Sequence, residues 1–537
     1  MASMVLLLLV GCGAGEDADP LAKVDSRFAE ISLSLAAADR DTTRNVHNKD
    51  ARRRKSEAEG EKVAFFKDTR VMEAILAAQG APDGSLLKIR GDVYARKALE
   101  TRAWTSADKA EETRLLGVLD EAASRSAEWF TSDGRKFTLD RSWDEVSREA
   151  DGLEDAVRQE LATAFASHRM QLAGPDLIAL VKLRNEVAKR AGYANYYQLS
   201  LNAQGLSQSQ VDSVVSQLTE VVRPFFAVDR AAIAAANPGV VDDFANHPRL
   251  RRVAKIGTEA ELADAFFDAD LAEERIVTAY HDMGFDTADL QLYTGPSRIV
   301  RPGVYGFVIR PPEFVAIVLS VDERWSAWPY QALMHEAGHA VWWMNLSPES
   351  AASPATWEPD APWFEGYAQF FERVLAEPAF TAKYVPELPE EARVGFRAAR
   401  VRDAAEGIAN AIVATQAERN LYESPDNLAG AFQLAETLRS ELTGAPGSGA
   451  DYDPSLLSGL LWHYPAYSSN YLFAYLTEAR LWDGVRTAIG EPVGNARLGP
   501  FLVDSMVRQP ATQSFEARLA AISPGDGAAA LSAYLRM

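Results

Sequence analysis

The chain has 537 residues, of which 47% are hydrophobic and 24% are charged, as is usual for folded soluble proteins. This length allows several domains or one large enzyme body. A formal net charge of −21 argues against nucleic acid or an anionic membrane surface as a partner, because both would repel the protein. Since Cys12 is the one cysteine, no disulfide can form within the chain.

Residues 1–20 have the pattern of an export signal followed by a short tether. The apolar run Val5–Val10 ends in Gly11 and Cys12, and it resembles a bacterial lipoprotein signal. Cleavage would leave Cys12 as a lipidated first residue, so we expect a lipid-anchored or periplasmic location in the bacterial cell envelope. Residues 1–4 lack the basic side chains typical of such signals. An apolar N-terminus on a cytosolic protein is therefore the alternative.

The remainder, residues 21–537, is predicted to form one domain in which helices dominate. Ala, Leu, Glu and Arg recur at helical spacing from Leu21 to roughly Asn237, and helices resume after a proline-rich loop at Ser347–Ala361. Val304–Ile309 and Phe314–Leu319 are the convincing strands, joined by a hairpin-like link. The edge of such a sheet could hold a substrate peptide by strand addition.

A histidine pair follows the second strand closely. In the stretch Tyr330–Met344, His335 and His339 are four residues apart, so on a helix their rings lie on one face and can bind one metal ion. Glu336 stands beside them. This is the H-E-x-x-H arrangement of zinc hydrolases, in which the glutamate is the general base. The alternative is a buried histidine pair that only packs.

Two glutamates compete to be the third metal ligand. Glu358 lies 18 residues after His339, but Pro354 and Pro359 flank it and disfavour a helix. Glu365 lies 25 residues after His339, near the start of a predicted helix that begins after Asp360. We therefore prefer Glu365 as the ligand. Gln369 and Glu372 fall on the same helical face, and either of them could orient a ligand histidine.

These motifs resemble those of the gluzincin metallopeptidases. Glu365-Gly366-Tyr367-Ala368, with a glutamate seven residues after the first, is similar to the second zinc helix of that group. The most similar families are those of angiotensin-converting enzyme and thimet oligopeptidase. The resemblance implies a mainly α fold: a large helical two-lobed body around a deep channel, with one zinc ion and a small β-sheet beside the zinc helix. It implies zinc-dependent hydrolysis of peptide bonds in oligopeptides.

The resemblance also assigns residues to the oxyanion that forms during peptide attack. A histidine and a later tyrosine bind it in these families, and His463 and Tyr471 stand in those places. Tyr467 and Tyr475 lie one helical turn before and after Tyr471, so spacing alone does not choose among the three. A tyrosine stripe that packs in the core is the alternative.

The sequence departs from the converting-enzyme family at two positions. Leu461 stands where that family has a lysine that grips the substrate carboxylate, and Asn470 replaces an arginine of its chloride site. The choice between peptidyl-dipeptidase and oligopeptidase types therefore stays open. Two further alternatives are an aminopeptidase of the same clan and a non-catalytic envelope lipoprotein that binds peptides and retains a zinc ion.

Overall fold

The computed structural model of the chain describes residues 19–45, 47–124, 128–138, 143–256, 263–296, 304–310, 314–321, 327–446, 459–510 and 512–536. The expected export signal and Cys12 lie outside the described residues. Within the ranges that are described, no helix is both long enough and apolar enough to cross a lipid bilayer.

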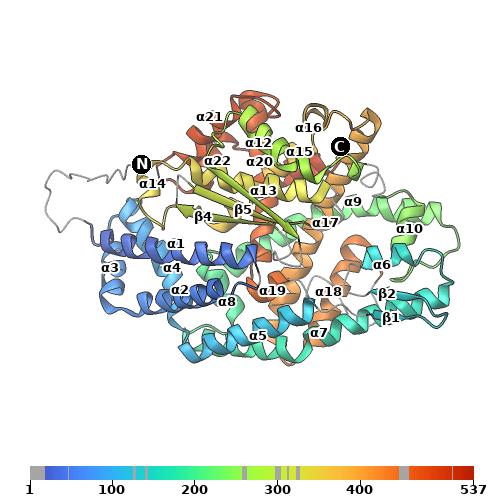
Figure 1. The fold of residues 1–537 in the computed structure, drawn as a ribbon, viewed down its shortest axis with the longest axis horizontal. Helices are drawn as coiled ribbons and strands as arrows, with labels where there is room; N and C mark the ends of the chain where they lie inside the picture. Colours follow the sequence, from blue (N-terminus) through green and yellow to red (C-terminus); the bar gives the residue numbers. More distant parts are fainter. Residues whose placement is uncertain are drawn as a thin grey trace.

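Helices make up most of the described chain, which confirms the predicted fold class (Figure 1). The helices that precede the three-stranded sheet are α1 (Ala22–Arg44), α2 (Lys49–Lys67), α3 (Thr69–Gln79), α4 (Leu86–Arg102), α5 (Ser106–Ser124), α6 (Trp143–Glu149), α7 (Asp155–Arg190), α8 (Tyr196–Ala203), α9 (Gln208–Ala236), α10 (His247–Val253) and α12 (Ala269–Asp282). Those that follow it are α13 (Ala327–Met344), α14 (Pro348–Ala351), α15 (Ala361–Ala376), α16 (Pro378–Tyr384), α17 (Glu390–Glu423), α18 (Leu428–Thr443), α19 (Gly459–His463), α20 (Ser468–Ile489), α21 (Leu498–Leu502), the π-helical turn η2 (Val503–Val507), α22 (Phe515–Ile522) and α23 (Gly527–Leu535).

The three-stranded sheet has the order β3-β5-β4, with β3 at Leu290–Pro296, β4 at Val304–Arg310 and β5 at Phe314–Val321. The predicted pair β4 and β5 is antiparallel, with Val304 opposite Leu319, whereas β3 runs parallel to β5. The sheet lies between α1 and α13, both of which contact β4 and β5 (Figure 1). A second, two-stranded sheet, β1 (Glu128–Phe130) with β2 (Lys136–Thr138), was not predicted from the sequence.

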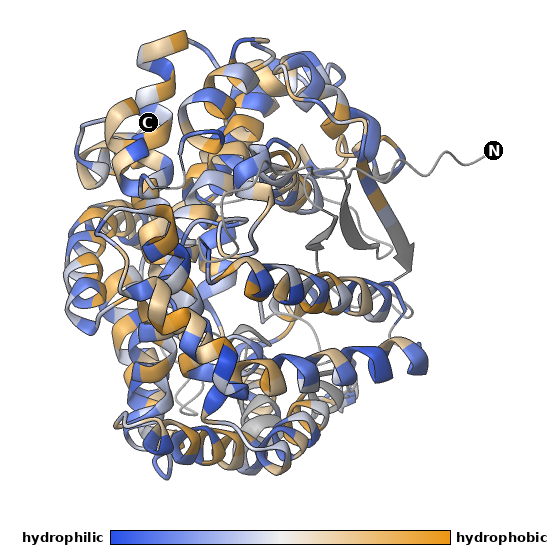
Figure 2. Ribbon diagram, turned by 90° about the vertical axis from the view of Figure 1, so that its left-hand side faces the viewer, coloured by the Kyte–Doolittle hydropathy of each residue, from blue (hydrophilic) through white to orange (hydrophobic). Residues whose placement is uncertain are grey.

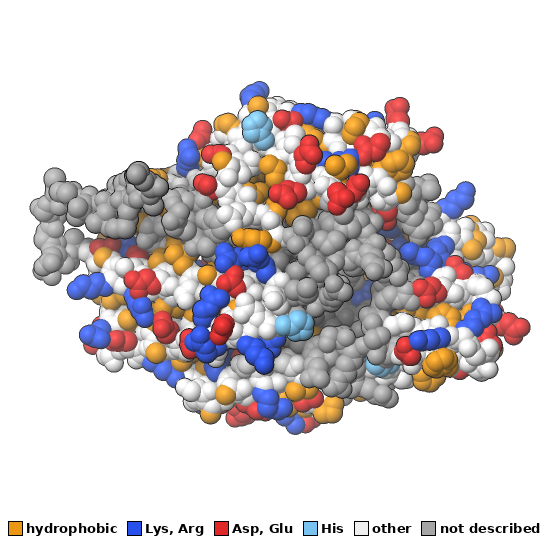
Figure 3. All heavy atoms as spheres, viewed as in Figure 1, with side chains coloured by type: hydrophobic (Ala, Val, Ile, Leu, Met, Phe, Trp, Pro, Cys, Tyr) orange, Lys and Arg blue, Asp and Glu red, His pale blue; other side chains and the backbone are white. Residues whose placement is uncertain are grey.

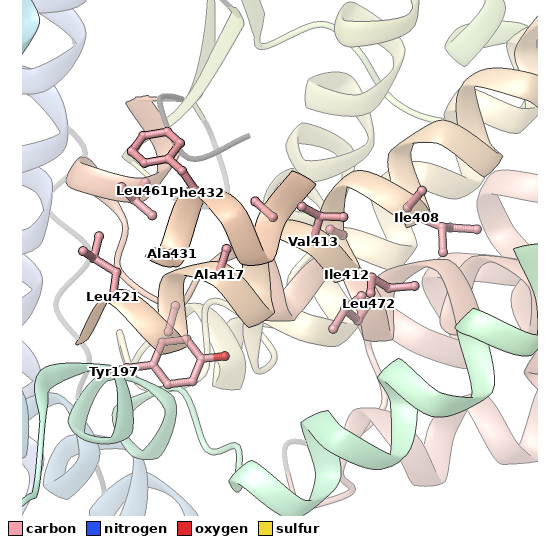
Figure 4. Packing of buried hydrophobic residues seen from close by; sticks show 14 of the residues in the cluster. Tyr197, Ile408, Ile412, Val413, Ala417, Leu421, Ala431, Phe432, Leu461 and Leu472 are labelled. Atoms are coloured by element: carbon pink, nitrogen blue, oxygen red, sulfur yellow. The ribbon is translucent and has the colours of Figure 1, made fainter. Parts of the chain in front are cut away.

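The described residues form two large hydrophobic cores, and the predicted division into two lobes stays a prediction. The first core gathers buried residues of α5 to α9, α17, α18 and α23, and Figure 4 shows part of it. The second gathers residues of α12, α13, α15, α16, α21 and α22. The long helix α20 joins them, because it contributes Leu472 to the first core and Trp482 to the second. Figure 2 shows hydrophilic and hydrophobic residues side by side along the helices, as expected of amphipathic helices around shared cores.

Helices α1 to α4 have a third, smaller core built around Phe28, Phe66 and Tyr94. Buried Asp25 ties these helices to the loop before α15, since its Oδ1 accepts hydrogen bonds from Tyr94 (2.5 Å) and from Ser353 (2.6 Å). A salt bridge of 2.6 Å between Arg96 of α4 and Asp360 adds a second link. Asp360, the residue after which α15 was expected to begin, stands at the N-cap position, but its side chain pairs with Arg96 and makes no capping hydrogen bond.

Charged side chains of both signs are interspersed over the face seen in Figure 3. On that face the described side chains gather no extended surface of one sign, although the whole chain is acidic.

Candidate metal centre

Two glycines allow the helices that carry the predicted ligands to approach closely. A Cβ atom on Gly338 of α13 would lie 2.7 Å from the ring of Phe371 and 3.1 Å from the Cα of Ala368, both on α15. On the other side of α15, a Cβ on Gly366 would lie 2.5 Å from the side chain of Thr477 in α20. Such distances are too short for any larger residue without movement of the neighbours. The glycines therefore bring α13, α15 and α20 together at the site.

His335, His339 and Glu365 form the group that could hold a metal among the described residues. One ligand atom from each lies within 4.8 Å of the others. The Oε2 atom of Glu365 is 3.2 Å from Nε2 of His335 and 3.9 Å from Nε2 of His339. The preferred third ligand is thus the one that lies beside the histidines, and Glu358 is not part of the group.

The donor set fits a metal ion. Two imidazole nitrogens and one carboxylate oxygen are the ligands of many catalytic zinc sites, at about 2.0–2.2 Å from the ion. Glu365 is only 6% exposed, and its Oε2 atom has no hydrogen-bond partner in the protein. An unpaired buried carboxylate oxygen is costly, and a cation between the three side chains would remove that cost.

Of Gln369 and Glu372, the two residues predicted as candidates to orient a ligand histidine, Glu372 is the one that contacts His335. Its Oε1 atom accepts a hydrogen bond from Nδ1 of His335 at 2.6 Å, which directs the other ring nitrogen toward Glu365. Its Oε2 accepts from Nε2 of Gln331 at 2.5 Å, and Arg400 of α17 donates to Oε1 of Gln331 at 2.6 Å. Both carboxylate oxygens of Glu372 are therefore occupied, and the amide of Gln331 is fixed.

Gln369, the other candidate for this role, makes no such contact. Its side chain is buried, and its Oε1 has no hydrogen-bond partner in the protein. Gln331 was not predicted as a site residue, although its spacing from His335 indicates that it lies on the same helical face. Gln331 lies four residues before His335, so both project from one face of α13.

The charges of the group favour a cation at this point. Burial lowers the pKa of His339 to about 3, so its ring is neutral and can act as a ligand. Burial also disfavours the charged form of Glu365, but the imidazole of His335, whose Nε2 lies 3.2 Å from its Oε2 atom, outweighs burial and lowers the pKa of Glu365 to about 2. Burial opposes protonation of His335, yet Glu365 and Glu372 raise its pKa well above the ordinary value. The carboxylates thus stabilise positive charge beside the imidazoles.

Glu336 stands next to the group without joining it. Burial raises the pKa of its carboxyl to about 7, and the backbone amide of Gly306 in β4 hydrogen-bonds to it. A Cβ atom on Gly306 would lie 2.5 Å from Oε2 of Glu336, so the strand approaches this carboxylate because position 306 has no side chain. A carboxyl that titrates near neutral pH can take up and release a proton at little cost.

Tyr467 and Tyr471 are the tyrosines that lie near the ligands. The hydroxyl of Tyr467 donates a hydrogen bond to Oε1 of Glu365, a contact that was not predicted. The ring of Tyr471 packs edge-on against that of Tyr467, with centroids 5.7 Å apart. Burial raises the pKa of Tyr471 well above its ordinary value, and the charges of Glu365 and Glu336 raise it further. The charges of the ligand Glu365 and of Glu336 therefore both act on the Tyr471 hydroxyl.

Tyr475 and His463 are placed differently. A Cβ atom on Gly407 would lie 2.1 Å from the Tyr475 hydroxyl, so this side chain packs against α17. His463 is the last residue of α19, and its ring is half-buried, 6.3 Å from that of Tyr464. Of the three tyrosines that spacing left open, Tyr475 is thus the one directed toward another helix.

No protein-family model matches the chain, and no curated protein matches it. Solved structures do match over nearly its whole length. The carboxypeptidase of Pyrococcus furiosus covers 98% of this chain and 99% of its own, with a TM-score of 0.70 and 13% identity. The inhibitor-bound Pz peptidase A covers 96% and 92%, with a TM-score of 0.67 and 14% identity. The Deinococcus radiodurans M32 carboxypeptidase covers 96% and 97%, with a TM-score of 0.63 and 13% identity. The chain shares one fold with these peptidase structures.

Proposed function

We propose that the protein is a zinc-dependent metallopeptidase of the gluzincin type that hydrolyses peptide bonds in oligopeptides. One observation carries the proposal: Glu365 of α15 lies against the histidine pair of α13, with Glu336 beside them as a separate carboxyl. That combination supplies a metal site with a general base next to it. The fold shared with solved peptidases supports the same reading.

In the proposed reaction, His335 and His339 through their Nε2 atoms and Glu365 through its carboxylate would hold the zinc ion. The chemistry that zinc supplies in such a site is Lewis acidity, which acidifies water and polarises a carbonyl group. Glu336 takes the proton from the attacking water and then gives it to the leaving amine. Its pKa of about 7 suits both steps near neutral pH.

The negative charge that develops on the carbonyl oxygen needs hydrogen-bond donors. By resemblance Tyr471 is one donor, and its ring packs against that of Tyr467, which binds the ligand Glu365. His463 begins the segment that leads to Tyr471, and by resemblance it donates as well. Removal of one such donor typically lowers kcat by about 10²- to 10³-fold.

A digest of a mixed peptide pool, followed by mass spectrometry, tests the proposal. The zinc-loaded protein should cleave peptides, whereas the variant Glu336→Gln should bind zinc equally and release no products. Free, N-blocked and C-amidated forms of one cleaved peptide then identify the type: loss of cleavage on N-blocking indicates an aminopeptidase, and loss on C-amidation indicates a carboxyl-terminal exopeptidase. If the zinc-loaded wild type leaves every peptide intact, the proposal is wrong.

A further inference from the structure

The turn between α19 and α20 adopts a conformation that its own sequence disfavours. His463 ends α19 just before the turn, Tyr467 is its last residue, and Tyr471 lies in the first turn of α20 that follows. Within it, Ala466 has a φ of 59°, in the left-handed region, and it is 0% exposed. For an alanine this region is unfavourable, since the Cβ atom crowds the backbone. Contacts from outside the turn must therefore stabilise this conformation.

Side chains from three other helices bind the backbone of this turn. On the carbonyl side, Arg184 of α7 donates to the oxygen of Trp462 at 2.6 Å, and Ser200 of α8 donates to that of Pro465 at 2.8 Å. On the amide side, the Oε1 atom of Glu418 in α17 accepts from the N–H of Ala466 at 2.8 Å. We call Arg184, Ser200 and Glu418 the turn clamp.

The clamp is itself rigid. Arg184 is 2% exposed and is held by Glu112 of α5 (2.9 Å) and by the hydroxyl of Tyr422 in α17 (3.2 Å). Glu418 is 1% exposed and lies on α17 next to the core residues Ala417 and Leu421. The helices that carry these side chains, α7, α8 and α17, contribute to the first core, whereas the ligand helices α13 and α15 pack in the second. The clamp therefore fixes the tyrosine segment relative to the metal group from helices of the first core.

We propose that Glu418 is a positioning residue: by binding the amide of Ala466 it holds the turn so that Tyr467 reaches Glu365 and Tyr471 packs against Tyr467. This inference rests on the proposed peptidase function. Glu418 is not part of the ligand group and binds the amide of Ala466, so we expect its effect on turnover to pass through the turn. A displacement of catalytic donors by about 1 Å can lower turnover on the order of 10²-fold.

Two substitutions separate the hydrogen bond from the packing. Glu418→Gln keeps an acceptor for the Ala466 amide, whereas Glu418→Met fills a similar volume without one. With zinc-loaded protein and a peptide that the wild type cleaves, we expect Glu418→Gln to keep its kcat within about twofold. Glu418→Met should lose 10- to 100-fold in kcat with little change in KM and in zinc content.

A matched control removes core volume elsewhere. Leu218→Ala in α9 opens the same hydrophobic core, in which Leu218 is 0% exposed, and α9 carries none of the three clamp residues. It should lower the melting temperature yet keep kcat at temperatures where the protein is folded. Hydrogen exchange over residues 462–470 should accelerate in Glu418→Met and stay unchanged in Leu218→Ala.

A third variant tests the strained alanine directly. Glycine populates the left-handed region freely, so Ala466→Gly should restore part of the turnover that Glu418→Met loses, because the turn then needs less external support. The proposal is overturned if Glu418→Met matches an active wild type both in kcat and in hydrogen exchange of residues 462–470. It is also overturned if the double variant Glu418→Met/Ala466→Gly has no higher kcat than Glu418→Met. An inactive, zinc-loaded wild type instead refutes the proposed peptidase function.

Discussion

The hydrogen bond between Glu372 and His335 makes a quantitative prediction about metal affinity. The replacement Glu372→Leu removes a 2.6 Å charge-assisted hydrogen bond to Nδ1 of His335, and it leaves Gln331 without its acceptor. Hydrogen bonds to charged groups contribute about 1.5–3 kcal/mol, and groups that orient zinc ligands typically change metal affinity 10- to 100-fold. We expect zinc to bind to this variant about 10- to 100-fold more weakly.

The conservative replacement Glu372→Gln should have a smaller effect. A glutamine offers one oxygen where the carboxylate offers two, so it can satisfy either His335 or Gln331 but not both. Gln331 cannot compensate by turning its amide, because Arg400 binds its carbonyl oxygen at 2.6 Å. The loss of zinc affinity should therefore fall between the wild type and Glu372→Leu.

Competition with a chelator of known affinity, at fixed pH and ionic strength, measures the dissociation constants. Gln369→Leu is the control, since Gln369 lies on the same helix and its Oε1 has no partner. Its zinc affinity should stay within about twofold of the wild type, because no bond to a ligand is removed. Equal affinities for wild type and Glu372→Leu, or an equal loss for Gln369→Leu, would refute the assignment of Glu372.

Three further predictions concern stability. Gly338→Ala should lower the free energy of unfolding by about 1–3 kcal/mol and weaken zinc binding. The reason is that the new methyl group would meet the backbone Cα of Ala368, which cannot move without the rest of α15. Chemical denaturation measures the loss, and an unchanged denaturation midpoint would contradict this prediction. Arg373→Met should lower the free energy of unfolding by about 3–5 kcal/mol, because it leaves buried Glu478 without the guanidinium that lies 3.0 Å away. Calorimetry measures the loss, and the double variant Arg373→Met/Glu478→Gln should recover most of it. Burial raises the pKa of Glu418 to about 8 in the folded protein, so the unfolded state loses this proton first and stability should fall as pH rises from about 4.5 to 8. Glu418→Gln has no titrating group at this position, so the pH dependence from Glu418 is absent. The free energy of unfolding of Glu418→Gln should therefore rise relative to that of the wild type across this window, by on the order of 4 kcal/mol. A difference in denaturation midpoint that does not change with pH would contradict this prediction.

Local patterns in the sequence determined the elements that carry the site. The four-residue spacing of His335 and His339 places both rings on one face of a helix whatever surrounds it, and the structure has that helix as α13. The helical presentation of Glu365, against the proline-flanked Glu358, likewise selected the carboxylate that lies beside them. Both inferences succeeded because helix geometry relates residues that are near in the chain.

Only the tertiary structure decided which distant groups meet at the site. Tyr467, Tyr471 and Tyr475 are equivalent by spacing, and they are distinguished by contacts with Glu365 and Gly407, which lie more than 60 residues away in the chain. The pairing of Glu418 with the amide of Ala466 spans 48 residues and leaves no local pattern. Such contacts depend on how α13, α15, α17 and α20 pack. That packing is set by side-chain volumes on several helices at once, and no periodicity within one segment encodes it.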